Sequence, residues 1–125
     1  ESVREGTIQY CKARNAFGKP IGSFQNSRFV LAELAAEATA VRILTDEFIR
    51  LHLDGKLTAD QAAMAKWWTT EAQVKLVDRC LQLHGGYGYL REYIVARAFL
   101  DARVQSIYGG TAEIMKEIIG RSLGV

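Results

Sequence analysis

The 125-residue sequence has one proline, Pro20, and two cysteines, Cys11 and Cys80. It also lacks a continuous apolar run of the ~18 residues that a membrane span needs. The spacing of the cysteines fits neither a metal site nor a disulfide framework, and two thiols are typical of a reducing compartment. Charge of one sign does not dominate, because 16 basic residues stand against 14 acidic ones. This balance predicts no nucleic-acid partner and no membrane partner.

Alternating β-branched stretches are nearly absent, whereas helix-forming residues with apolar spacing of three and four fill most of the chain. Glycines and the proline separate expected helices over roughly 1–15, 24–53, 58–84, 92–104 and 111–120. We expect Ser23, Thr58 and Thr111 to be N-caps, with Gln61 completing a capping box at Thr58.

Two long helices joined by a short turn must be antiparallel. The sequence therefore predicts an all-α fold, an up-down four-helix-type bundle with long antiparallel helices, as a single domain over 1–125. For the helix over 58–84 we expect an apolar face of Ala65, Trp68, Ala72, Leu76, Cys80 and Leu83. The two histidines lie far apart and form no cluster with metal-ligand spacing, so we predict no metal site.

Three glycine-bearing loops, 14–20, 82–89 and 107–113, each combine glycine with an aromatic side chain and a polar donor. Glycine lets a ligand approach the backbone, and aromatic rings offer a stacking surface. Arg14 and Lys19 can meet a phosphate, and the helix that begins after Thr111 presents free N–H groups to an anion. The same loops are also typical of helix termination and interhelical packing, and the residues alone leave both interpretations open.

Five motifs, in this order and spacing, resemble the acyl-CoA dehydrogenase family over essentially the whole chain, with the long-chain members most alike. They are Arg14-x-x-Phe17-Gly18-Lys19-Pro20-Ile21 with Phe24-Gln25, Ala62-Ala-Met-Ala-Lys66, Gln82-x-x-Gly85-Gly86-x-Gly88-Tyr89, Arg97-x-x-x-Asp101-Ala102 and Ile107-Tyr108-Gly109-Gly110-Thr111-x-Glu113-Ile114. The resemblance implies an FAD enzyme that introduces an α,β double bond into an acyl-CoA substrate. It further implies that an electron-transfer flavoprotein accepts the electrons.

The resemblance also implies which residues meet the ligands. FAD would be bound by Arg14, Phe17 and Gln25 from the neighbouring subunit, by Gln82, Leu83, His84, Gly85 and Gly86 at the adenine end, and by Thr111, Ala112 and Glu113 at the last helix. Tyr108, Gly109 and Gly110 would border the thioester of the substrate. A cofactor shared between subunits implies a homo-oligomer, either a dimer or a tetramer.

The family's catalytic base is a glutamate, which many members place directly after the tyrosine of the last motif. Gly109 stands there and cannot act as a base. Long-chain and isovaleryl members have glycine or alanine at that position and carry the glutamate on the helix that leads into this domain. We therefore expect no catalytic residue within the chain and place the base upstream of Glu1.

On this resemblance the chain is a C-terminal piece of a subunit, without the family's N-terminal helical domain and middle β-domain. We expect it to be inactive alone and to work in a bacterial cytoplasm or a mitochondrial matrix. Two other functions stay open. One is a non-catalytic helical association module, which the missing base favours. The other is a relative of the acyl-CoA oxidase type, in which oxygen takes the electrons.

Overall fold

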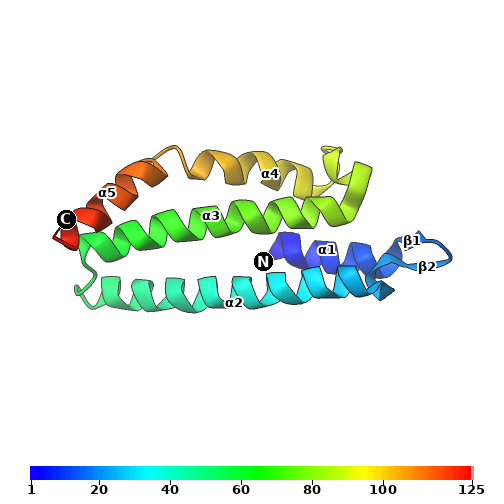
Figure 1. Cartoon of the computed structure of the whole chain (residues 1–125), viewed down its shortest axis with the longest axis horizontal. Helices are drawn as coiled ribbons and strands as arrows, with labels where there is room; N and C mark the ends of the chain where they lie inside the picture. The colour runs from blue at the N-terminus through cyan, green and yellow to red at the C-terminus, as the bar shows by residue number, and fades with distance from the viewer. Residues whose placement is uncertain (125) are drawn as a thin grey trace.

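The computed structural model describes residues 1–124, which form five α-helices. They are α1 (Ser2–Ala13), α2 (Gln25–Leu53), α3 (Ala59–His84), α4 (Ile94–Gln105) and α5 (Ala112–Ser122), with the 3₁₀ helices η1 (Ile21–Ser23) and η2 (Gly85–Tyr89). Helices α1 to α4 run alternately in opposite directions, and α5 continues in the direction of α4 (Figure 1). Two strands of two residues each, β1 (Asn15–Ala16) and β2 (Lys19–Pro20), pair antiparallel. The predicted all-α class is confirmed.

Helix α3 lies in the middle, with α4 and α5 along one side and α1 and α2 along the other (Figure 1), and all four pack against it. A cluster of buried apolar side chains from α2, α3 and α4 forms the core: Leu34, Val77, Cys80, Val95 and Ala102. Within 1–124 no helix is both long and apolar enough to cross a bilayer.

The expected apolar face of α3 is partly wrong. Cys80 is fully buried, but Trp68 is 39% exposed, and Thr70 and His84 are buried instead. Both of these polar side chains bond to the helix backbone: Thr70 Oγ1 donates to the Lys66 carbonyl at 2.8 Å, and His84 Nδ1 lies 2.9 Å from the Cys80 carbonyl oxygen. Since these bonds satisfy the polar groups, the central helix can bury them at little cost.

Two of the three expected caps are confirmed. Thr58 and Gln61 form the capping box, and Thr111 Oγ1 accepts a hydrogen bond from the Ile114 N–H at 3.4 Å. Ser23 is not a cap, because it is the last residue of η1, where its hydroxyl donates to the Pro20 carbonyl at 2.7 Å, and the N-cap position of α2 falls on Phe24. Helix α2 therefore begins later, with Phe24 at its N-cap and no capping side chain.

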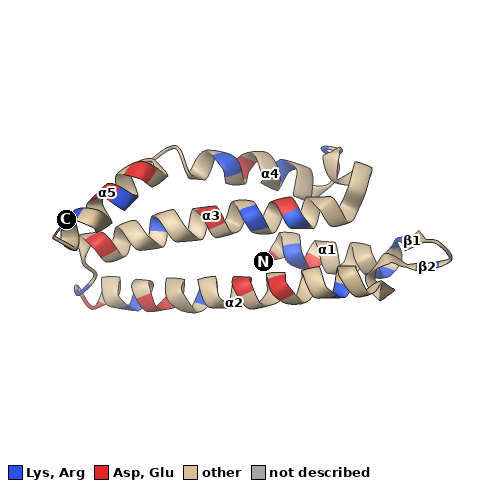
Figure 2. Ribbon diagram, viewed as in Figure 1, with Lys and Arg blue, Asp and Glu red and all other residues tan. Residues whose placement is uncertain are grey.

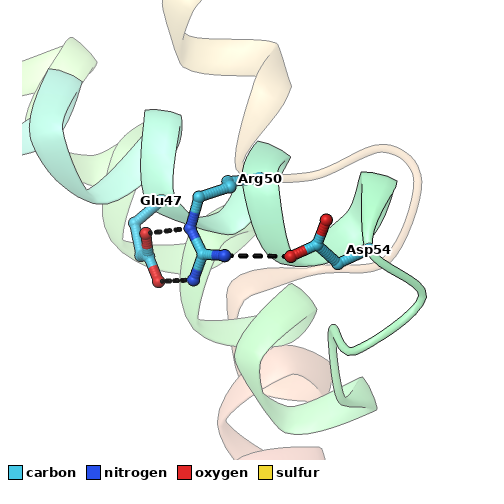
Figure 3. A network of polar contacts seen from close by, with 3 residues as sticks. All are labelled: Glu47, Arg50 and Asp54. Atoms are coloured by element: carbon cyan, nitrogen blue, oxygen red, sulfur yellow. Dashed lines mark hydrogen bonds and ion pairs between the residues drawn. The ribbon is translucent and has the colours of Figure 1, made fainter.

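Basic and acidic side chains are interspersed along the helices (Figure 2). Near the end of α2, Arg50 forms two hydrogen bonds to the Glu47 carboxylate, at 2.7 and 2.8 Å, and one to Asp54 at 2.9 Å (Figure 3). All three side chains are exposed to solvent. Such pairs contribute little to stability, so the fold depends mainly on the apolar contacts of α3.

Candidate functional site

A cleft of about 470 Å³ lies where the end of α1 meets the end of α3. We call it the Arg14 cleft; its lining includes Arg14 from one predicted loop and residues 82–87 from another. Tyr10, Ile21 and Leu90 complete the lining. The structure thus brings together two predicted loops that are separated by most of α2 and α3.

The glycines after α3 shape the floor of this cleft. Gly85 has φ of 59°, a backbone conformation that L side chains rarely adopt, and it ends the helix. At Gly88 a Cβ would approach the Leu81 carbonyl oxygen to 2.7 Å, so only glycine lets η2 fold back against α3. At Gly85 and Gly86 a Cβ would meet nothing within 4 Å, which leaves that backbone open to a ligand.

Arg14 supplies the positive charge of the cleft. Its guanidinium carbon lies 5.1 Å from the centre of the Tyr87 ring. Within residues 1–124 its guanidinium pairs with no carboxylate, whereas Arg42, Arg50, Arg79 and Arg121 do. The side chain is therefore placed to meet an anion from outside the chain.

Burial raises the pKa of Tyr10, an effect that the positive charge of Arg14 partly offsets. The hydroxyl therefore keeps its proton and donates a hydrogen bond to the His84 carbonyl oxygen, with 3.2 Å between the two oxygen atoms. The His84 ring stacks on Tyr10 with 4.2 Å between ring centres. Sequence reasoning missed Tyr10 because nothing within α1 indicates its partner, which lies 74 positions away.

Two predicted residues stand outside the Arg14 cleft. Phe17 is 95% exposed at the tip of the β1–β2 hairpin, where its φ of 51° is unusual for a bulky side chain. Gln25 is exposed at the first position of α2. Neither residue lines the Arg14 cleft of its own chain. A ligand in that cleft would have to extend out of it to contact Phe17 or Gln25.

A second cleft, of about 520 Å³, lies between α3, α4 and the start of α5. We call it the Thr111 cleft, because the predicted Thr111, Ala112 and Glu113 line it. It uses residues 71–78 of α3, whereas the Arg14 cleft uses 82–84. At a rise of 1.5 Å per residue these stretches are centred about 13 Å apart, so the structure does not join the third loop to the first two.

Glu113 already uses part of the α5 N-terminus. Its own backbone N–H and the Thr111 hydroxyl lower the pKa of its carboxyl group. The carboxylate thus places a negative charge and hydrogen-bond acceptors at the start of α5, beside the Thr111 cleft.

The predicted substrate turn lies next to the Thr111 cleft. Gly109 and Gly110 have φ of 63° and 97°, and Tyr108 is exposed. Lys66 Nζ donates to the Gly110 carbonyl and ties the turn to α3. At Gly110 a Cβ would meet only Met115 Cε, the far end of a flexible side chain, so the positive φ rather than packing favours glycine there.

Residues 1–124 match the family model described as "Acyl-CoA dehydrogenase, C-terminal domain". The chain belongs to the acyl-CoA dehydrogenase family. It is 46% identical to the mouse "Long-chain specific acyl-CoA dehydrogenase, mitochondrial" over 123 residues, which cover 98% of this chain and 29% of that protein. The resemblance read from the five motifs is confirmed.

Two solved structures place this acyl-CoA dehydrogenase domain within its family. An acyl-CoA dehydrogenase from Geobacillus kaustophilus superposes with a TM-score of 0.95 at 45% identity, over 98% of this chain and 32% of that one. The FAD complex of PigA superposes with a TM-score of 0.89 at 31% identity, over 98% and 32%. The chain thus spans about a third of the length of its relatives, which include a mitochondrial protein and a bacterial one.

Proposed function

We propose that the chain is the C-terminal, FAD-contacting and subunit-contacting domain of a flavin-dependent acyl-CoA dehydrogenase. In this proposal the whole subunit desaturates an acyl-CoA thioester and passes electrons to an electron-transfer flavoprotein. The observation that carries it is the Arg14 cleft, which unites Arg14 with residues 82–86, the two loops predicted to hold the cofactor.

The residues of the Arg14 cleft fit one end of FAD. Arg14 offers a positive charge to the diphosphate, and Gln82 offers a side-chain amide. The open backbone at Gly85 and Gly86 lets an adenine approach closely. The cleft volume of about 470 Å³ also lies within the range of small-molecule sites. The bound flavin would supply the hydride-accepting chemistry, while this chain supplies binding and orientation.

The separation of the two clefts supports a cofactor held between two copies of the chain. Because the Arg14 cleft and the Thr111 cleft use different stretches of α3, we assign one cleft of each protomer to the same FAD. Exposed apolar side chains such as Ile43 and Leu53 leave surface for contacts with a second subunit or another domain. The assembly is therefore a homo-oligomer in this proposal.

The test compares two arginines in the full-length subunit. Arg14→Gln removes the unpaired cation of the cleft, whereas Arg42→Gln removes a surface arginine that pairs with Asp46 on α2. We expect Arg14→Gln to raise the FAD dissociation constant about tenfold or more, since charge-assisted hydrogen bonds are the strong ones. Arg42→Gln should leave it unchanged. Flavin fluorescence during titration of the apoprotein measures both.

Two outcomes contradict the proposal: a full-length subunit that assembles but binds no FAD, as an association module would, or equal FAD affinity in the two variants. A 125-residue chain that binds FAD with submicromolar affinity would contradict the expectation that the rest of the subunit is needed to hold the cofactor. Anaerobic bleaching of the flavin by acyl-CoA, followed by its reoxidation rate in air, separates a dehydrogenase from an oxidase.

A further inference from the structure

The Arg14 cleft depends on two helix ends that are far apart in the sequence. Arg14 is the C-cap of α1, and residues 82–86 span the end of α3. The backbone continuity of either helix does not fix the distance between them. Some contact between α1 and α3 must therefore set the width of the cleft.

Tyr10 and His84 form the contact between these helices that lies in the cleft itself. Their rings are stacked, with 4.2 Å between centres and 22° between planes, and the Tyr10 hydroxyl donates to the His84 carbonyl at 3.2 Å. Tyr10 lies one helical turn before Arg14, and the Arg14 N–H donates to the Tyr10 carbonyl at 2.8 Å. His84 is followed directly by Gly85 and Gly86. The stack thus joins the last turn of α1 to the last turn of α3.

His84 is held from its other sides as well. It is 7% exposed, and its Nδ1 lies 2.9 Å from the Cys80 carbonyl oxygen. A carbonyl oxygen only accepts hydrogen bonds, so Nδ1 carries the proton and donates. Tyr93, the N-cap of α4, meets the edges of both rings, with centres 5.9 Å from His84 and 6.0 Å from Tyr10. The ring of His84 is therefore enclosed by contacts from α1, α3 and the start of α4.

We propose that His84 is a positioning residue whose stack on Tyr10 sets the spacing between Arg14 and the Gly85–Gly86 backbone, and thereby the affinity for FAD. This inference rests on the proposed function. In this inference the affinity for FAD depends on the ring pair of Tyr10 and His84, and not on the general stability of the fold. A phenylalanine at either position keeps a ring, whereas an alanine removes it.

The experiment uses the full-length subunit and four variants: His84→Ala, His84→Phe, Tyr10→Ala and Tyr10→Phe. Each alanine variant should raise the FAD dissociation constant about tenfold, and each phenylalanine variant should stay within about threefold of the parent. Combining the two alanine changes should add little to either one, because they remove the same contact.

Leu34→Ala is the matched control for stability. Leu34 is fully buried in the core, away from the lining of the Arg14 cleft. It should lower the melting temperature at least as much as His84→Ala and leave the FAD dissociation constant within about threefold of the parent. Equal weakening of FAD binding by Leu34→Ala and His84→Ala would overturn the inference, as would unchanged binding in His84→Ala. A parent subunit that binds no FAD would instead refute the proposed function.

Discussion

The two halves of α2 lie in different surroundings. Helix α1 runs beside the first half only (Figure 1), and there Leu34 packs with Val77, Cys80 and Val95 in the core. Between residues 39 and 53 no side chain is fully buried; Ile43 is 66% exposed and Leu53 80%. In the second half α3 is the main helix packed against α2, so apolar side chains there are at most partly buried. Full burial on α2 thus requires a further helix beside α3, and the outer side of the second half is available for another part of the protein.

The largest expected difference between the halves comes from shortening one apolar side chain in each. Leu34→Ala leaves a cavity among three helices and should lower the free energy of unfolding of the 125-residue chain by about 3 kcal/mol. Ile43→Ala removes exposed atoms and should lower it by less than about 1 kcal/mol. Urea unfolding followed by circular dichroism measures both, and equal losses would show that the distal half is also covered in solution.

A second pair of changes compares two glycines after the end of α3: Gly88, which is tightly packed, and Gly86, which is open to the cleft. Gly88→Ala brings a Cβ to 2.7 Å from the Leu81 carbonyl oxygen and should cost about 2 kcal/mol. Gly86→Ala meets nothing within 4 Å and should change stability by less than about 0.5 kcal/mol. Thermal unfolding of both variants compares them. A tolerated Gly88→Ala would contradict the close approach of η2 to α3.

Lys66 tests whether the Gly109–Gly110 turn is fastened to α3. Lys66→Met keeps the length of the side chain but removes the donor to the Gly110 carbonyl, which should cost about 1 kcal/mol. Lys75→Met removes an exposed pair with Glu37 and should cost less. Amide hydrogen exchange at 108–112 should rise only in the first variant. A rise in both would argue for a general loosening of α3.

The smallest effect is expected from the exposed network at the end of α2. The hydrogen bond from Arg50 favours the charged form of Glu47, so the pKa of this carboxyl group is lower in the folded state than its ordinary value. Its stabilising contribution is therefore present above the ordinary glutamate pKa and is lost as the pH falls through the lowered, folded-state pKa. In an Asp54→Asn background, which removes the second partner of Arg50, Arg50→Gln should thus lower the melting temperature slightly at pH 7 and not at all once Glu47 is protonated. A difference that persists in acid would assign the effect of Arg50 to packing.

Most of the helix boundaries could be predicted from short sequence patterns such as N-caps. The capping box at Thr58 and the cap at Thr111 depend on neighbours within one turn, so the sequence contains the whole interaction. The cap at Ser23 was wrong because residues 21–23 form η1, which moves the N-cap position of α2 to Phe24. Apolar spacing in the sequence does not reveal this short 3₁₀ turn.

The sequence was enough to predict which loops form the candidate site, but not how the folded chain brings them together. The glycines of 82–89 and the charge of Arg14 are visible in the sequence, and the structure joins them in one cleft. The stack of Tyr10 on His84 depends on how α1 crosses α3, which no local pattern encodes. The third loop lines a cleft of its own, because the turn after α4 meets a different stretch of α3.

The distance between the two clefts also bears on mixed assemblies. If one cofactor takes the Arg14 cleft of one protomer and the Thr111 cleft of the next, a protomer with a damaged Arg14 cleft still offers a sound Thr111 cleft. Pairing it with a protomer damaged at the other cleft restores one complete site and leaves one doubly defective. Co-expression of two individually inactive alleles would then recover part of the activity that neither allele gives alone.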